Sequence, residues 1–222
     1  MAIEPILPRD YSAQTMKEQY ARVAWFYDTW SRLTEDTALT RLLELAEVQD
    51  GMQVLEVAVG TGWLFEKLVA RNQSGRNEGL DLSPDMLAHA HRRLERSNPK
   101  PCYQLLEGSA YKLPFESSSF DVLFNAFMLD MFPVEDYPRV LTEFGRVLKP
   151  EGKVAIAYFS RGSKRINHFW SWVAKHFPAL LTGCRPVVLE PSLQRAGFRI
   201  VHHEQISQNT FPSTVVIAQK GK

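Results

Sequence analysis

From Met52 onward the sequence alternates short strand-like runs with longer helical ones, and this alternation restricts the fold more than any other feature. It is typical of βαβ units, in which helices cover both faces of a parallel sheet. The strand-like runs are Met52–Val57, Glu78–Leu82, Tyr103–Leu106, Phe120–Asn125 and Lys153–Phe159. The helical runs are Trp63–Val69, Pro84–Leu94, Tyr137–Leu148 and Ile166–Leu181. We therefore predict an α/β fold with a doubly wound, mostly parallel, seven-stranded Rossmann-like sheet.

The alternation of strand-like and helical runs stops near the end of the sequence. Phe198–His202 and Ser213–Ala218 are two further strand candidates. Too few residues separate them for a crossover helix, which a parallel connection requires. We therefore expect the last strand to run antiparallel.

The first fifty residues have a different pattern, since helical spacing gives way to strand-like runs only at Gly51. Leu39, Leu42, Leu43 and Ala46 recur at the spacing of one amphipathic helix, and a second helix is expected around Met16 to Trp30. We predict a helical cap over residues 1–50 and a core over residues 51–222, with a substrate lid at about 160–190.

A Gly-x-Gly turn, Gly60 to Gly62, follows the first strand of this core and opens a helix. Glycines accept backbone dihedrals that other residues avoid, and they let a ligand lie against the main chain. Such a site belongs at the carboxyl end of the strand. The alternative is a tight turn with no ligand. The dinucleotide fingerprint needs a third glycine where this chain has Phe65, which disfavours a nicotinamide-dependent oxidoreductase.

The second strand ends at Asp81, nineteen residues after Gly62. A carboxylate at this position can accept hydrogen bonds from both hydroxyls of a ribose. Ser83 as N-cap and Pro84 at the first helical position then start the next helix. A capping or solvated acid is the alternative, but the spacing from the glycine turn favours ribose binding.

Further blocks agree with this arrangement: Gly108–Phe115, Ser119–Leu123 and Arg146–Lys153. With the two motifs above, they make the chain resemble a class I S-adenosylmethionine-dependent methyltransferase over roughly Val54 to Phe159. More narrowly, it is similar to the ubiquinone/menaquinone C-methyltransferases and the bacterial phosphatidylethanolamine N-methyltransferases. The resemblance implies S-adenosylmethionine as cofactor and a small-molecule or lipid-like methyl acceptor. A methyltransferase-fold protein that binds without catalysis remains an alternative.

The resemblance also assigns cofactor-binding residues. Glu56, Gly60, Thr61 and Gly62 would surround the methionine part, Asp81 would bind the ribose, and Leu82 and Met86 would flank the adenine. Ser109, where many relatives have Asp, and Ala110 would lie near the adenine amino group. Asn125 would face cofactor and substrate, or cap its strand. Tyr27 lies in an aromatic segment that would close over the cofactor or pack in the core.

Methyl transfer needs alignment and exclusion of water, but no compulsory metal or covalent nucleophile. His168, in the predicted lid, is a candidate general base, and a surface histidine is the alternative. No metal site is expected. His89 and His91 point to different faces of a helix, and His202 and His203 alternate across a strand.

The composition restricts the classes of partner and the cellular location that we expect. Twenty-six basic and twenty-five acidic residues give a net charge of +1, so nucleic acid is not expected as a partner. Two separate cysteines and an N-terminus without a basic region or apolar run indicate a cytoplasmic protein. Nothing in the sequence indicates an oligomeric state.

The segment from Gly152 to Leu189 contains no Asp or Glu. Within it, the apolar residues Ile166, Phe169, Trp170, Val173, Phe177, Leu180 and Leu181 fall at helical spacing, with Trp172, Lys175 and His176 off that stripe. The first interpretation is a lid helix packed on the sheet. The second is peripheral contact with an anionic membrane, through cations and interfacial aromatics.

Overall fold

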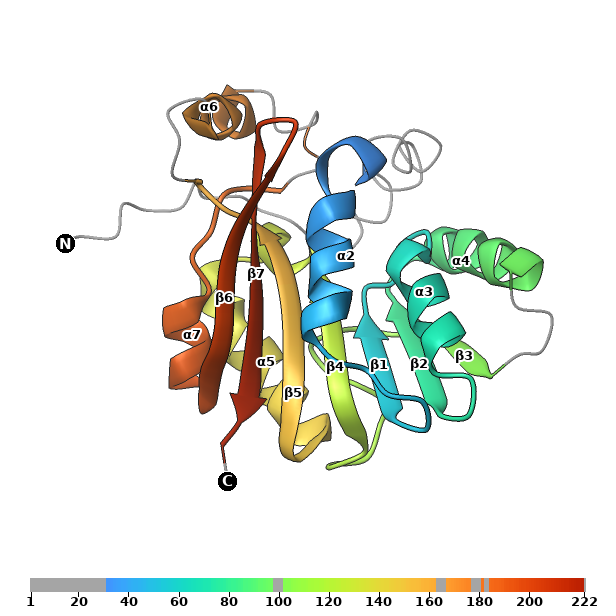
Figure 1. Ribbon diagram of the computed structural model, residues 1–222. Helices are drawn as coiled ribbons and strands as arrows, with labels where there is room; N and C mark the ends of the chain where they lie inside the picture. The colour runs from blue at the N-terminus through green and yellow to red at the C-terminus, as the bar shows by residue number, and fades with distance from the viewer. Residues whose placement is uncertain (1–30, 98–101, 163–166, 177–180, 182–183, 222) are drawn as a thin grey trace.

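The computed structural model describes residues 31–97, 102–162, 167–176, 181 and 184–221. These residues form a seven-stranded sheet with the order β3-β2-β1-β4-β5-β7-β6 (Figure 1). The strands are β1 (Gln53–Val57), β2 (Arg76–Asp81), β3 (Tyr103–Glu107), β4 (Phe120–Ala126), β5 (Leu148–Phe159), β6 (Phe198–Gln208) and β7 (Phe211–Lys220).

Strands β3, β2, β1, β4 and β5 pair in parallel, whereas β7 pairs antiparallel with both β5 and β6. The predicted sheet and its antiparallel last strand are therefore confirmed. The last two strands of the chain, β6 and β7, are longer than the sequence indicated, so only Asn209 and Thr210 connect them. Their φ angles of 47° and 70° are those of a tight hairpin turn, which leaves no room for a crossover helix.

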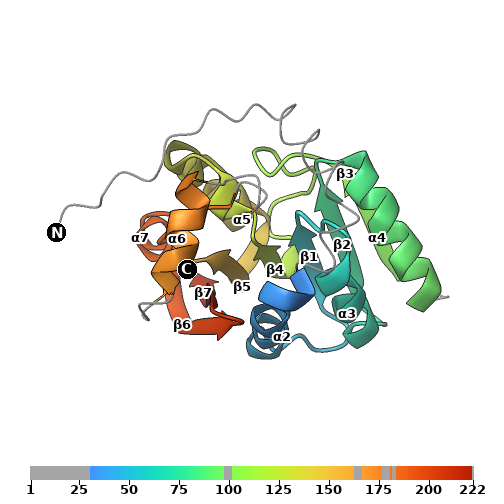
Figure 2. The same ribbon diagram turned by 90° about the horizontal axis from the view of Figure 1, so that it is seen from above.

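Helices cover both faces of the sheet, as predicted. On one face lie α2 (Asp36–Leu45), α3 (Trp63–Arg71) and α4 (Pro84–Ser97), and on the other α5 (Tyr137–Val147) and α7 (Glu190–Arg195). Figure 2 shows the two layers from above. Short 3-10 turns, η1 (Leu129–Met131) and η2 (Val134–Asp136), link β4 to α5.

The apolar pattern of each element explains its position. In β1, Val54, Leu55 and Val57 have no exposed surface, as expected for a parallel strand buried on both faces. In α5, residues Val140, Phe144 and Val147 recur at helical spacing and are fully buried against the sheet. Two separate hydrophobic cores result, one on each face of the sheet.

Helix α2 is the part of the expected N-terminal cap that the structure describes. The predicted amphipathic helix is confirmed, with Leu39, Leu42 and Leu43 buried in the same core as α3. Its start is bound to the β6–β7 hairpin, because Gln208 Oε1 accepts from the Thr37 N–H at 2.6 Å and Asn209 Nδ2 donates to the Leu33 carbonyl at 2.8 Å. The second predicted helix, around Met16 to Trp30, lies outside the described residues.

Helix α6 (Asn167–His176) lies near the tip of this hairpin (Figure 1). Val173 and Ala174 are buried, and the Trp170 indole N–H donates to Thr210 Oγ1 at 3.0 Å. Because these residues face the protein, Phe169 faces outward and is 51% exposed. The predicted position of Phe169 on the buried stripe is therefore wrong. Ile166, Phe177 and Leu180 lie outside the described residues.

Phe169 instead stacks on the equally exposed Trp172, with 6.1 Å between ring centroids. Trp172, Lys175 and His176 lie off the buried side, as predicted. In the described part of the chain, no helix is both long enough and apolar enough to cross a membrane.

Candidate functional site

The glycine turn after β1 forms the floor of the candidate site. Gly60 and Gly62 have φ angles of 54° and 81°, in the left-handed region that favours glycine. The two differ in their surroundings. A Cβ on Gly62 would lie 2.9 Å from the Cα and Cβ of Ala90 on α4, whereas a Cβ on Gly60 would meet none of the described residues within 4 Å. Gly62 thus allows α3 and α4 to pack, and the described residues leave space above Gly60. Thr61 between them is buried.

Asp81, at the end of β2, connects that strand to the turn. Its Oδ2 accepts from the Gly60 N–H at 2.8 Å, and its Oδ1 accepts from the Ser83 N–H at 2.9 Å. Only 8% of the residue is exposed, and this burial raises the pKa of the carboxyl, although the two amides oppose the rise. Each carboxylate oxygen has two acceptor sites, so both can still bind ligand hydroxyls.

Glu56 is the second buried acid of the site. It lies in β1, is 2% exposed, and its Oε2 has no hydrogen-bond partner among the described residues. Burial first, and the charge of Asp81 second, raise the pKa of Glu56 well above its usual range. A buried carboxyl oxygen with no partner is costly, so a cationic ligand group at this position would be favoured.

The residues predicted beside the adenine are brought close to Asp81. The Asp81 carbonyl accepts from the Gly108 N–H at 2.9 Å, which places the Ser109–Ala110 turn next to the end of β2. Ala110 is buried, and the Ser109 hydroxyl accepts from the Tyr111 N–H at 3.3 Å. On the α4 side, Leu82 is half-buried and Met86 is 2% exposed.

Asn125, at the end of β4, has no exposed surface. Its side-chain amide donates to the Val57 carbonyl at 2.9 Å, and so ties β4 to the last residue of β1. Its Oδ1 has no hydrogen-bond partner among the described residues. The amide therefore caps the strand end, one of the two predicted roles, and contact with the cofactor stays a prediction.

Two other predicted residues cannot be placed in the site. Tyr27 lies outside the described residues. His168 lies on the described helix α6, but its side chain is not among those described. Both roles stay predictions. Among the described residues, no group of three or more His, Cys, Asp or Glu side chains could hold a metal ion.

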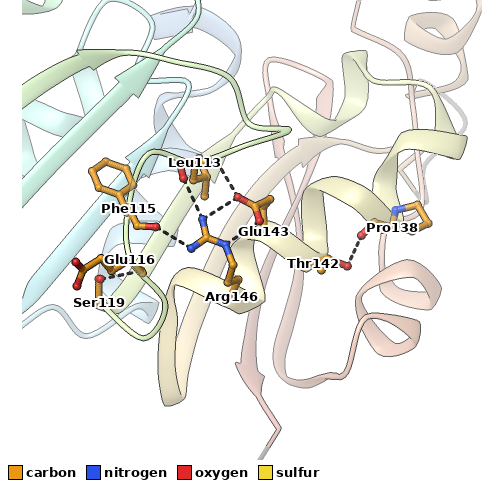
Figure 3. Close-up of polar contacts among 8 residues, drawn as sticks. All are labelled: Leu113, Phe115, Glu116, Ser119, Pro138, Thr142, Glu143 and Arg146. Atoms are coloured by element: carbon orange, nitrogen blue, oxygen red, sulfur yellow. Dashed lines mark hydrogen bonds and ion pairs between the residues drawn. The ribbon is translucent and has the colours of Figure 1, made fainter.

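An Arg146–Glu143 pair on α5 holds the loop that carries Ser109, a role that the sequence analysis missed (Figure 3). The Arg146 guanidinium donates to the carbonyls of Phe115 at 2.7 Å and Leu113 at 2.9 Å. Glu143 Oε2 accepts from the Leu113 N–H at 2.8 Å, and Arg146 lowers the pKa of this carboxyl. These hydrogen bonds from α5 thus fix the loop that leads back to Ser109.

Sequence analysis also missed a buried polar cluster beyond β4 and β5. Asp130, on η1, has no exposed surface, and its Oδ2 accepts from the Phe159 N–H at 2.9 Å. Arg185 lies beside it and is 6% exposed. One signal was present, because Asp130 is the only charged residue in the apolar run Phe127–Phe132.

With this geometry established, comparison with known proteins identifies the family. A methyltransferase domain family matches residues 54–152. The chain is 32% identical to demethylmenaquinone methyltransferase from Lactobacillus johnsonii over 184 residues, which cover 80% of this chain and 75% of the relative. This chain belongs to the class I S-adenosylmethionine-dependent methyltransferases.

Two further comparisons agree. Demethylmenaquinone methyltransferase from Bacillus cereus strain B4264 is 39% identical over 113 residues, or 50% of this chain and 46% of that relative, so the match spans about half its length. Magnesium protoporphyrin IX methyltransferase from Synechocystis PCC 6803, solved with bound S-adenosylhomocysteine, is 13% identical. It superposes with a TM-score of 0.66, covering 96% of this chain and 90% of that one, and so shows the same fold. These matches support the methyltransferase prediction and S-adenosylmethionine as cofactor.

Proposed function

We propose that this protein transfers a methyl group from S-adenosylmethionine to a small-molecule or lipid-like acceptor of the quinol or aminophospholipid type. The main support is the combination of Glu56 and Gly60 at the carboxyl edge of the sheet. Within the described part of the chain, a buried acid with an oxygen that has no hydrogen-bond partner lies beside a turn with space above it. The pair fits a ligand that carries a cation and lies close to the main chain.

We infer the cofactor contacts from this placement together with the resemblance. When bound, S-adenosylmethionine supplies an electrophilic methyl group on a sulfonium. Glu56 would attract the cationic methionine part, and Asp81 would accept the ribose hydroxyls while it keeps the glycine turn in place. Leu82, Met86 and the Ser109–Ala110 turn would enclose the adenine. The protein then contributes mainly by aligning the two reactants and excluding water.

The acceptor class comes from the resemblance and from the relatives' names. Calorimetric titration with S-adenosylmethionine and S-adenosylhomocysteine tests cofactor binding. A screen of quinols and aminophospholipids with a labelled methyl group then tests the acceptor class. We expect binding of both cofactor forms and transfer to one acceptor class. Binding without transfer would favour the non-catalytic alternative, and absence of binding would refute the proposed function.

Peripheral membrane contact is part of the same proposal. Phe169 and Trp172 form a stacked, half-exposed aromatic pair, and Lys175 is exposed on the same helix. Aromatic rings and a cation on one short helix suit the boundary of an anionic bilayer, where such a cation contributes about 1 kcal/mol. This surface would bring the protein to a lipid-like acceptor.

Vesicle co-sedimentation tests the membrane contact. We expect binding to anionic vesicles at low salt, release at high salt, and loss of binding in the Phe169→Ala/Trp172→Ala double variant. Val201→Ala is the matched control, since Val201 is 44% exposed on β6, away from this helix. Equal binding by the two variants, or no preference for anionic over neutral vesicles, would refute the contact and leave α6 as an ordinary lid.

A further inference from the structure

Three buried polar side chains from different parts of the chain meet beyond the carboxyl ends of β4 and β5. They are Asp130 on η1, Tyr137 at the start of α5 and Arg185 in the segment before α7. All three are at most 6% exposed. The Asp130 carbonyl accepts from the Arg185 N–H at 3.3 Å, and the Arg185 guanidinium donates to the Phe132 carbonyl. We call these three residues the Asp130 cluster.

The Asp130 cluster is incompletely hydrogen-bonded. The Phe159 N–H donates to Asp130 Oδ2, whereas the described residues form no hydrogen bond of ordinary geometry to Asp130 Oδ1 or to the Tyr137 hydroxyl, although Cys184 and Arg185 lie beside them. In folded proteins nearly all buried polar atoms have a partner, so two neighbouring exceptions need an explanation. A ligand with hydrogen-bonding groups would supply both missing partners.

The cluster lies beside the cofactor half of the site. Asn125 ties β4 to the glycine-turn strand on one side, and its amide also lies 3.5 Å from the sulfur of Met128, two residues before Asp130. On the other side of β4, the Asp130 carboxylate binds the main chain of β5. A molecule lying over the end of β4 would therefore have the glycine turn on one side and Asp130 on the other.

The electrostatic surroundings suit proton transfer. Burial raises the pKa of Asp130 to about 7, although the Phe159 N–H, the Arg185 guanidinium and the Cys184 thiol all act to lower it. Burial also raises the pKa of Tyr137, which therefore stays protonated. At neutral pH the Asp130 carboxyl can thus exchange a proton, which an exposed aspartate does not readily do.

We propose that Asp130 is the catalytic base that takes the proton from the methyl acceptor, with Arg185 and Tyr137 beside it to stabilise the acceptor's developing negative charge. The proposal rests on the proposed methyl transfer. The bond between methyl carbon and sulfur breaks as the bond from carbon to acceptor forms. The sulfonium becomes a neutral thioether, and the acceptor's proton moves to Asp130 Oδ1.

Asp130 has no exposed surface, so the proposal includes a movement of the chain segment 184–189, which hydrogen-bonds to it. Main-chain hydrogen bonds join it to η1 and β5, from Arg185 to Asp130 and from Val187 to the Phe159 carbonyl at 3.0 Å. When these open, the acceptor can reach the carboxylate, and when they close again water is excluded from the reacting atoms.

The test compares wild type with Asp130→Asn, in which the amide oxygen can still accept from Phe159. The probe is a prenylated 1,4-naphthoquinol without the 2-methyl group. We expect kcat to fall by about 100-fold or more, the usual contribution of a general base, and KM for S-adenosylmethionine to change less than about twofold. In wild type, kcat should fall as the pH drops below about 7, and Asp130→Asn should lack this dependence. Asp130→Glu should recover part of the rate.

Two further variants separate this role from a structural one. Glu78→Gln removes another buried carboxyl, in β2 and outside the site, one of whose oxygens has no partner among the residues that the structure describes, and should leave kcat unchanged. His168→Gln removes the base predicted from the sequence. If Asp130→Asn keeps the wild-type rate and pH profile, or if only His168→Gln loses the acid limb, the proposal is wrong.

A second measurement does not depend on the acceptor. Carbon-13 NMR of labelled aspartate carboxyls, with S-adenosylhomocysteine bound, should show a resonance that titrates near pH 7 and is absent from Asp130→Asn. An Asp130 that is still ionised at about pH 5 would overturn the proposal. If wild type fails to bind S-adenosylhomocysteine, the proposed function is wrong. If it binds but does not methylate the naphthoquinol, only the acceptor is wrong, and the titration decides on Asp130.

Discussion

The burial of Asp130 predicts an unusual dependence of stability on pH. A carboxyl whose pKa is higher in the folded than in the unfolded state favours folding while it is protonated. Its contribution is therefore complete below the unfolded pKa of 3.8 and is lost as the pH rises through the folded pKa of about 7. Most carboxylates that are paired in the folded state behave in the opposite way.

The magnitude follows from the two pKa values. Each pH unit between 3.8 and about 7 corresponds to about 1.4 kcal/mol, so the whole contribution is about 4 kcal/mol. Between pH 5 and pH 8 it amounts to about 2–3 kcal/mol. Asp130→Asn carries no titratable proton and should lack this loss. Relative to wild type, it should therefore gain about 2–3 kcal/mol in unfolding free energy from pH 5 to pH 8.

Urea unfolding of both proteins at the two pH values measures this double difference. Glu56 and Asp81 also have raised pKa values, but they contribute equally to the unfolding free energy of both proteins, so their contributions cancel. Glu143→Gln is a control that should show almost no difference from wild type between these pH values, because Arg146 lowers the pKa of Glu143 and its contribution is lost only below the unfolded pKa of 4.5. If wild type and Asp130→Asn change equally between pH 5 and pH 8, Asp130 has an ordinary pKa and the argument from burial fails.

Three predictions concern the cofactor side of the site. Asp81→Ala should weaken S-adenosylhomocysteine binding by about 2–4 kcal/mol in calorimetry, because charge-assisted bonds to the ribose are lost; unchanged affinity would remove Asp81 from the site. Gly60→Val should abolish binding but leave a folded protein, whereas Gly62→Val should lower the melting temperature because of the clash with Ala90; equal melting temperatures would contradict this difference. Cofactor binding should release a proton from Glu56, seen as a binding enthalpy that depends on the buffer, and Glu56→Gln should remove that dependence.

The sequence predicted most of the fold because its signals were local. The period of each run, the N-cap at Ser83 and the short connection before β7 all depend on neighbours in the chain. The absence of a third glycine after Gly60 and Gly62 is another such local signal. Phe65, which stands in its place, is fully buried and packs edge-on against Tyr103 with 6.2 Å between ring centroids. The helix here is thus held to the sheet by an aromatic ring rather than by close backbone contact.

The parts of the site that sequence reasoning missed depend on contacts between distant segments. Arg185 follows Asp130 by fifty-five positions, and no local period connects them. The orientation of α6 is a similar case. Helical spacing defines an apolar stripe on its own, but the hydrogen bond from Trp170 to Thr210, on the hairpin turn, rotates the helix and leaves Phe169 outside. Tertiary contacts of this kind can be read only from the structure.

The position of β7 between β5 and β6 has a consequence for synthesis of the protein. Strand β6 leaves the ribosome first but has no neighbour in the sheet until β7 emerges and pairs with both strands. The start of α2 must wait equally long, because its hydrogen bonds go to Gln208 and Asn209 near the hairpin turn. Nascent chains arrested before Phe211 should therefore expose α2 and one edge of β5 to proteases and chaperones, and lengthening the chain to Lys220 should protect both together.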